Sequence, residues 1–387
     1  MAHEASQLVA GFIDLQVNGY KGTSFTPAPG VQLGDLREAC RAYLAESGAA
    51  AFCPTMVTAP LETYRRALPM LADLAEEEEF RGRIAGLHLE GPFISDKDGA
   101  VGAHDRLSVR PPSAALFDEL QLLARGHVRI MTIAAELDGA PELCRHCVAR
   151  GVAISLGHQL ASAADIERLA AAGATLATHV ANGIPNLMHR HENPVWPVLA
   201  DARLSACIIT DGHHLPPAVI GAIASAKRVG GTIVTSDIIC LGGMPAGTYD
   251  GADVGLGNEG EAIVREPSGK VHMPARACLA GSGSTMLQCM NHLHSLGRWV
   301  VGLQELLAVG RENPLRALGE EAAAAVRAAA AQTGPLLRFT EERGFELVAE
   351  TGLEAEAGCG GAKRKQAAVD GDGSGGGVLP TTKRGAH

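Results

Sequence analysis

The chain has 387 residues, of which 46% are hydrophobic and 20% are charged, and its formal net charge is −10 at pH 7. This composition is typical of a globular protein with a large core, and the negative charge argues against nucleic acid as the main partner. No run of about 18 apolar residues occurs and the first residues lack a basic, apolar leader, so we expect no membrane span, no secretion signal and a cytoplasmic protein.

Apolar runs typical of β-strands recur eight times along the chain, with helix-like segments between them. Alternation of this kind indicates parallel strands joined by crossover helices, and eight repeats predict a closed (β/α)8, or TIM, barrel. The strand-like runs lie at about 11–17, 50–57, 84–89, 128–134, 152–156, 174–178, 204–210 and 231–235. The helix-like segments lie at about 33–47, 60–78, 113–125, 140–150, 162–172, 194–200, 216–228 and 284–297.

The segments outside this repeat set the domain limits that we expect. Residues 1–10 form a short N-terminal lead-in, and the barrel spans residues 11–332, with helices at about 302–309 and 313–332 at its end. The turn-rich stretch at about 241–275 predicts a hairpin insertion after the eighth strand. Two short strands around Arg343-Gly344 make residues 333–353 a candidate remnant of a small β-domain, and the Gly-rich residues 354–387 predict a disordered tail.

Metal-competent side chains follow three of the predicted strands, at the end where a barrel carries its active site. His158 and His179 each follow an apolar run in GVAISLGHQLASAADIERLAAAGATLATHVANGIPN. In GLHLEGPF, Glu90 stands beside a Gly-Pro turn, and we expect it at the barrel mouth in preference to His88. One carboxylate and two imidazoles, with a fourth position for water, form the ligand set of a catalytic zinc site. Each residue alone is equally explained as a satisfied polar group at a strand end.

Other polar residues near predicted strand ends complete a candidate site. Asp237 follows the eighth strand and is placed to act as a general base, although alone it also fits a turn or cap aspartate. His104 lies in a glycine-containing loop that can fold over the mouth. His214, together with Asn182 and Gly183, offers a cationic group, a dipole and a backbone N–H to an anion. The set predicts a hydrolytic site for a small anionic substrate.

Seven motifs carry a family resemblance over about residues 11–320. GFIDLQVNG, GLHLEGPFIS, SLGHQLA, ATHVANGIPN, TDGHHLPP, VTSDIICLGG and LAGSGSTM resemble, in order and spacing, those of the N-acetylglucosamine-6-phosphate deacetylase family of the amidohydrolase superfamily. The resemblance implies hydrolysis of the acetamido group of N-acetyl-D-glucosamine 6-phosphate to D-glucosamine 6-phosphate and acetate, in amino-sugar catabolism. It implies one divalent metal ion, expected to be zinc, on Glu90, His158 and His179, with Asp237 as general acid/base.

The resemblance also assigns substrate contacts. It implies that His104 contacts the acetamido carbonyl or the sugar, and that Asn182, Gly183 and His214 hold the phosphate end. In HRHENPVW, Arg190 stands where the family has an arginine that reaches the phosphate of a neighbouring subunit, so a homodimer is one expected assembly.

The chain departs from the family pattern at two places. Many amidohydrolases carry His-x-His after the first strand for a second metal, whereas this chain has Gln16 and Asn18, and neutral amides are poor zinc ligands. Family members usually begin well before the first barrel strand, so the accompanying small β-domain is expected to be largely missing or incomplete. Two alternatives stay open: a related amidohydrolase that acts on another N-acyl sugar phosphate or a cyclic amide, and a truncated, non-catalytic relative.

Overall fold

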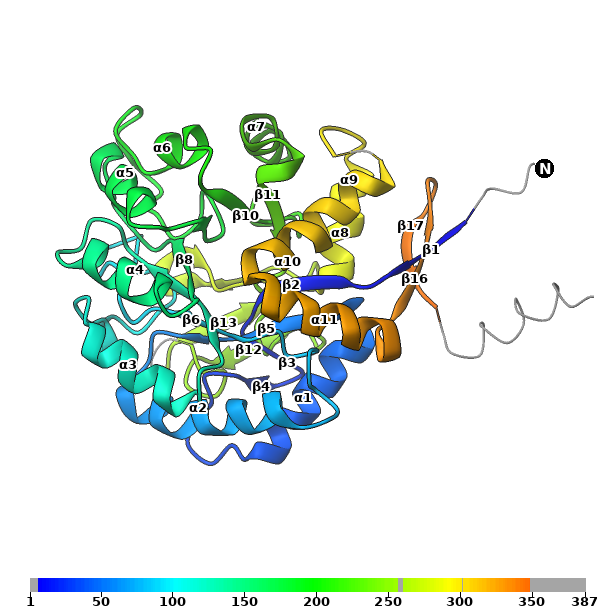
Figure 1. Ribbon diagram of the computed structural model, residues 1–387, viewed down its shortest axis with the longest axis horizontal. Coiled ribbons are helices and arrows are strands. Elements are labelled where there is room, and N and C mark those ends of the chain that lie inside the picture. The colour runs from blue at the N-terminus through cyan, green and yellow to red at the C-terminus, as the bar shows by residue number, and fades with distance from the viewer. Residues whose placement is uncertain (1–5, 257–259, 301, 349–387) are drawn as a thin grey trace, which may run out of the picture. The chain divides into compact units, whose positions relative to one another are not determined.

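The computed structural model describes residues 6–256, 260–300 and 302–348, and its centre is a sheet of eight parallel strands (Figure 1). Each strand pairs in parallel with the next one along the barrel. The first and last strands meet through a parallel bridge between Val17 and Ile238, and the N–H of Asn18 donates to the carbonyl oxygen of Ile238 at 2.7 Å. These contacts close the predicted barrel. Its strands are β2 (Phe12–Val17), β5 (Ala49–Val57), β6 (Leu87–Glu90), β7 (Val128–Ile133), β8 (Ala153–Leu156), β9 (Leu176–Ala177), β10 (Ser205–Ile209) and β11 (Thr232–Thr235).

Amphipathic helices surround the barrel because each has one apolar face to bury. In the fifth helix, for example, Ile166 and Leu169 are buried, while Ser162 and Asp165 form a capping box at the start. Parallel strands covered by helices are apolar on both faces, and all nine residues of β5 are buried. The outer helices are α1 (Leu33–Glu46), α2 (Leu61–Glu76), α3 (Ala114–Leu123), α4 (Ala140–Val148), α5 (Ala163–Ala171), α6 (Val195–Ala200), α7 (Pro217–Lys227) and α8 (Met286–Ser295). Short 3-10 turns lie at η1 (Arg106–Ser108) and η2 (Val229–Gly231).

A three-stranded antiparallel sheet joins the two ends of the described chain. Strand β1 (Gln7–Ala10) pairs with β16 (Leu336–Thr340), which pairs with β17 (Gly344–Leu347) (Figure 1). Residues 7–10 are therefore a strand rather than a plain lead-in. Sequence periodicity missed it because its partner lies more than 300 residues away, and only that partner satisfies its backbone groups.

The insertion after β11 is larger than the predicted hairpin. It forms a four-stranded antiparallel sheet of β12 (Gly247–Asp250), β13 (Ala262–Arg265), β14 (Val271–Met273) and β15 (Cys278–Leu279), with the 3-10 turn η3 (Pro274–Arg276) before the last strand. Its apolar side chains, among them Ile263, pack with Ile239 and Leu241 in one buried cluster. A small hairpin of β3 (Gly19–Tyr20) and β4 (Thr23–Ser24) follows β2.

The helices at the end of the barrel also differ from the prediction in one place. Segments α9 (Leu303–Leu307) and η4 (Ala308–Glu312) are followed by α10 (Asn313–Leu318) and α11 (Glu320–Thr333). The single helix predicted at 313–332 is interrupted at Gly319, whose φ of 81° is incompatible with a continuing helix. The predicted disordered tail at 354–387 lies outside the described residues. Within the described ranges, no helix combines the length and the apolar character needed to cross a membrane.

Candidate active site

A cavity of about 320 Å³ opens at the carboxyl ends of the barrel strands, and eight of the nine predicted site residues line it. The ninth, Arg190, is exposed and is absent from the lining. A larger cavity, of about 970 Å³, lies at the opposite ends of β8 to β11 and contains none of the nine. Barrel enzymes build their active sites at the carboxyl ends, so the smaller cavity is the candidate site. The eight lining residues are Glu90, His104, His158, His179, Asn182, Gly183, His214 and Asp237.

Three of these side chains reach the cavity through an unusual backbone conformation. His158, His179 and Asp237 have φ values of 50°, 26° and 49°, in the left-handed region that ordinary residues avoid. Such conformations cost of order 1–3 kcal/mol each and occur where surrounding contacts enforce them, often at functional sites. Gly183 is left-handed as well, and a Cβ there would lie 3.0 Å from the His179 ring and 3.1 Å from the His158 ring. A side chain at this position would be strained and would crowd both rings, so the site favours glycine.

Glu90, His158 and His179 present three atoms to one point. Glu90 Oε1 lies 2.9 Å from His179 Nε2 and 3.1 Å from His158 Nε2, and the two Nε2 atoms are 3.1 Å apart. His158 Nδ1–H donates to the carbonyl oxygen of Ala100 at 2.7 Å, which fixes the ring with Nε2 toward Glu90 and leaves that nitrogen as the one that can bind a metal ion. Ligand atoms about 2.0–2.1 Å from a tetrahedral zinc ion lie about 3.3 Å apart. The donor set therefore fits a divalent cation.

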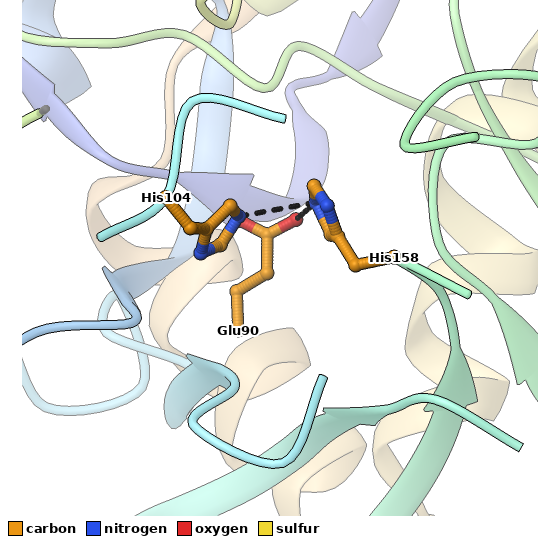
Figure 2. A group of neighbouring side chains, drawn as sticks. All are labelled: Glu90, His104 and His158. Atoms are coloured by element: carbon orange, nitrogen blue, oxygen red, sulfur yellow. Dashed lines mark hydrogen bonds and ion pairs between the residues drawn. The ribbon is translucent and has the colours of Figure 1, made fainter. Parts of the chain in front are cut away.

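His104 approaches the same point from the loop after β6, as Figure 2 shows. Ligand atoms of Glu90, His104 and His158 lie within 4.8 Å of one another, and His104 Nε2 is 3.1 Å from His158 Nε2. However, the backbone N–H of Thr58 donates to His104 Nδ1 at 3.1 Å. A neutral His104 with an accepting Nδ1 must carry its proton on Nε2. His104 therefore offers an N–H donor to the cavity, whereas a metal ligand needs a lone pair there.

The two carboxylates of the site differ in their protonation. Burial alone would raise the pKa of Glu90, but His158 and His179 hold it well below its usual range. Burial, with the charge of Glu90 as a second cause, raises the pKa of Asp237 to about 7. One group is thus held ionised while the other is poised to exchange a proton near neutral pH.

The amides of Gln16 and Asn18 hold the two carboxylates in place. Gln16 Nε2 donates to Glu90 Oε1 and to Asp237 Oδ1, both at 2.9 Å, and Asn18 Nδ2 donates to Asp237 Oδ1 at 2.7 Å. Both amides thus present N–H groups where a second metal ion would need lone pairs. Asp237 Oδ1 is occupied by two donors, so Oδ2 is the oxygen left for a proton or a substrate.

Two further side chains that line the cavity, His214 and Asn182, can donate hydrogen bonds to a ligand. His214 Nδ1 lies 2.8 Å from Asp211 Oδ2, and Asp211 Oδ1 accepts the backbone N–H of His214 at 2.9 Å. Burial alone would raise the pKa of Asp211, but His214 keeps it below its usual value. Within the described part of the chain, the buried Asn182 Nδ2 has no hydrogen-bond partner, so it is available to a ligand.

Two features of the site were not anticipated from the sequence. His88 lies on the same face of β6 as Glu90 but one layer deeper, where it contacts Thr132 Oγ1 at 2.8 Å, and burial lowers its pKa to about 4. Residues 277–281 of the insertion line the cavity. The types of these apolar and small residues do not indicate a role in binding or catalysis. Only the motif LAGSG, which begins with Leu279, pointed to this segment.

Comparisons with known proteins agree with this geometry, although no family model matches the chain. The human N-acetylglucosamine-6-phosphate deacetylase is 33% identical over 328 residues, which cover 81% of this chain and 75% of that protein. The N-acetylgalactosamine-6-phosphate deacetylase of Escherichia coli O157:H7 is 30% identical over 247 residues, which cover 64% of this chain and 63% of that protein.

A solved structure shows the same fold. It is a mutant N-acetyl-D-glucosamine-6-phosphate deacetylase from Mycobacterium smegmatis in complex with N-acetyl-D-glucosamine-6-phosphate, with a TM-score of 0.74 and 25% identity over 89% of this chain and 86% of that one. The barrel, the placement of the polar residues at its carboxyl end and these similarities agree. The chain belongs to the N-acetylglucosamine-6-phosphate deacetylase family.

Proposed function

We propose that this chain hydrolyses the acetamido group of N-acetyl-D-glucosamine 6-phosphate to give D-glucosamine 6-phosphate and acetate. The observation that carries the proposal is the convergence of Glu90, His158 and His179 beside Asp237 in one cavity of a barrel of this family. A reaction of this kind needs an activated water, a group that moves a proton, and donors for the carbonyl oxygen and the phosphate. The cavity has a candidate for each task.

Glu90, His158 and His179 are the proposed ligands of one divalent metal ion, with zinc as the expected ion. The family is metal-dependent, and the donor set fits such a cation. The ion would supply a Lewis acid that lowers the pKa of water and polarises the amide carbonyl. His104 is not assigned as a ligand because Thr58 occupies its Nδ1 and leaves an N–H at Nε2. A second ion is not proposed, because Gln16 turns N–H groups toward both carboxylates.

Asp237 is the proposed general base and acid. It accepts a proton from the attacking water at Oδ2, since Gln16 and Asn18 occupy Oδ1. It then donates this proton to the nitrogen of the departing amine, which must be protonated before the C–N bond breaks. A pKa raised to about 7 suits both directions of transfer near neutral pH.

The remaining donors are proposed to hold the substrate. His104 donates its Nε2–H to the acetamido carbonyl oxygen, where negative charge develops during attack. His214, supported by Asp211, and the Nδ2–H of Asn182 bind the phosphate together with the backbone of Gly183. In a homodimer, the exposed Arg190 would be available to the phosphate of the neighbouring subunit. We place the reaction in the cytoplasm.

The test is acetate release by the purified protein, with measurement of its metal content. The panel contains N-acetylglucosamine 6-phosphate, N-acetylgalactosamine 6-phosphate and unphosphorylated N-acetylglucosamine. The galactosamine epimer is included because a relative of this chain bears that name. Preference for the glucosamine phosphate supports the proposal, and preference for the epimer supports a related amidohydrolase. A metal-loaded protein that releases no acetate from any of the three compounds would contradict the proposal and favour a non-catalytic relative.

A further inference from the structure

An arginine of the insertion sheet contacts the loop that carries His104. Arg276, in η3, donates from Nη1 to the carbonyl oxygens of Gly102 and His104 at 3.1 and 3.0 Å. The other side of the same guanidinium binds Glu261, through Nε at 2.6 Å and Nη2 at 2.5 Å. The side chains of Arg276 and Glu261 are only 22% and 21% exposed, so the pair is held in a partly buried position. The contact therefore joins two segments that are about 170 residues apart.

The ion pair of Arg276 with Glu261 fixes the direction in which Arg276 Nη1 points. A guanidinium is planar and its donors form a rigid fork, so a carboxylate that binds Nε and Nη2 also fixes where Nη1 points. Glu261 precedes β13 and Arg276 follows β14, which places both residues on one sheet. The sheet thus presents Nη1 to the loop at a constant position.

Arg276 adds to contacts that hold the loop at other points: the carbonyl oxygen of Ala100 accepts from His158 Nδ1 at 2.7 Å, and Arg106 forms an ion pair with Asp98. Between β6 and η1 it contains no helix or strand, and Gly99 and Gly102 have φ values of 79° and 57°. The N–H of His104 donates to the carbonyl oxygen of Val101 at 3.2 Å, which makes only a local turn. Thr58 fixes the ring of His104 through Nδ1, and Arg276 fixes its backbone. Together they determine where the Nε2–H of His104 points.

We propose that Arg276 is a positioning residue, which acts through the backbone carbonyl groups of Gly102 and His104 to aim the His104 Nε2–H at the substrate carbonyl oxygen. The inference deepens the proposed function, because it rests on the role given there to His104. It also assigns a task to the insertion: the sheet holds one donor of the active site in place as well as covering part of the cavity.

The first experiment is a double-mutant cycle on acetate release. Arg276→Ala is expected to lower kcat by about 10- to 100-fold, the range for a misplaced catalytic group, with a much smaller change in KM. In the His104→Ala background the same change should lower kcat by less than about twofold, because the group that it positions is gone. Arg276→Lys should retain part of the activity, since an ammonium group reaches a carbonyl but cannot also bind Glu261 through two donors.

The control removes a more exposed arginine ion pair that does not line the cavity. Arg65 binds Glu119 at 2.9 Å on the outer helices, and Arg65→Ala should leave kcat unchanged. If Arg276→Ala lowers kcat equally with and without His104, the residue has only a structural role and the proposal is wrong. An unchanged kcat in the parent background overturns it as well. If Arg276→Ala fails to fold or to bind metal, the same cycle is measured with Arg276→Lys.

The second experiment does not depend on activity. Hydrogen–deuterium exchange of peptides that cover residues 97–105 should be at least about tenfold faster in Arg276→Ala than in the parent, and unchanged in Arg65→Ala. Equal exchange in the parent and in Arg276→Ala would show that the contact does not order the loop. If the parent releases no acetate from any substrate, the proposed function fails, while this measurement still decides whether Arg276 holds the loop.

Discussion

Replacing Asp237 by asparagine should stabilise the metal-free protein at neutral and alkaline pH. Burial and the nearby charge of Glu90 raise the pKa of Asp237 to about 7, whereas an unfolded chain has an aspartate pKa of about 3.9. Between these values the folded state retains a proton that the unfolded state has lost, so its stability falls as the pH rises through this window. Asparagine does not ionise, and its oxygen can still accept from Gln16 and Asn18.

The size of the effect follows from the two pKa values. A difference of about 3 pH units at about 1.36 kcal/mol per unit gives about 4 kcal/mol at pH 8, and close to zero near pH 4. This value is an upper limit, because the amide replaces one carboxylate oxygen by an NH₂ group. Histidine titration cancels in the difference between the two proteins except at His179, because the charge of Asp237 is one of the causes that raise the pKa of His179.

The assay is urea unfolding of both proteins after removal of metal by a chelator, at pH 4.5 and pH 8. Asp211→Asn is the matched control with the opposite sign, because His214 lowers the pKa of Asp211 and its ionised form stabilises the folded state. That variant should lose stability at pH 8. The reasoning is refuted if Asp237→Asn is no more stable than the parent at pH 8, or if its advantage is the same at both pH values.

Three further outcomes are expected. With metal bound, Asp237→Asn should lower kcat by about 10² to 10⁴ while metal content and substrate binding persist, and a rate within a few-fold of the parent would pass the role to Asp211. His179→Ala should abolish the one equivalent of tightly held metal seen by elemental analysis, so unchanged occupancy, or two equivalents in the parent, would contradict the ligand assignment. His214→Ala should raise KM for N-acetylglucosamine 6-phosphate much more than for unphosphorylated N-acetylglucosamine, and an equal loss for both would rule out a phosphate contact.

The local chemistry of the barrel was predictable from the sequence. Each barrel strand is a short apolar run with turn residues on both sides. The residues close to it in the sequence are therefore enough to predict it. Side chains that follow such runs must meet at one end of a parallel barrel, which is why the positions of Glu90, His158, His179 and Asp237 in the sequence are enough to group them.

Features that depend on distant partners were not predictable in this way. The acceptor role of His104 Nδ1 is set by the backbone of Thr58, and no pattern in the sequence joins the two residues. Arg276 is likewise an ordinary charged residue in the sequence, and only the fold brings it to Gly102 and His104. The pairing of β1 with β16 is the most distant case.

That pairing has a consequence for the order in which the protein can be completed on the ribosome. Gln7 pairs with Phe339 and Ala10 with Leu336, so more than 320 residues are synthesised between the two strands. At about 5–20 residues per second, β1 waits roughly 15 to 65 s for its partner, with Leu8 and Val9 unpaired during that time. An unpaired apolar strand can pair with another chain, so the interval is a window for misassembly. Slower translation should lengthen this window, and a chaperone that covers the first strand should protect the nascent protein during it.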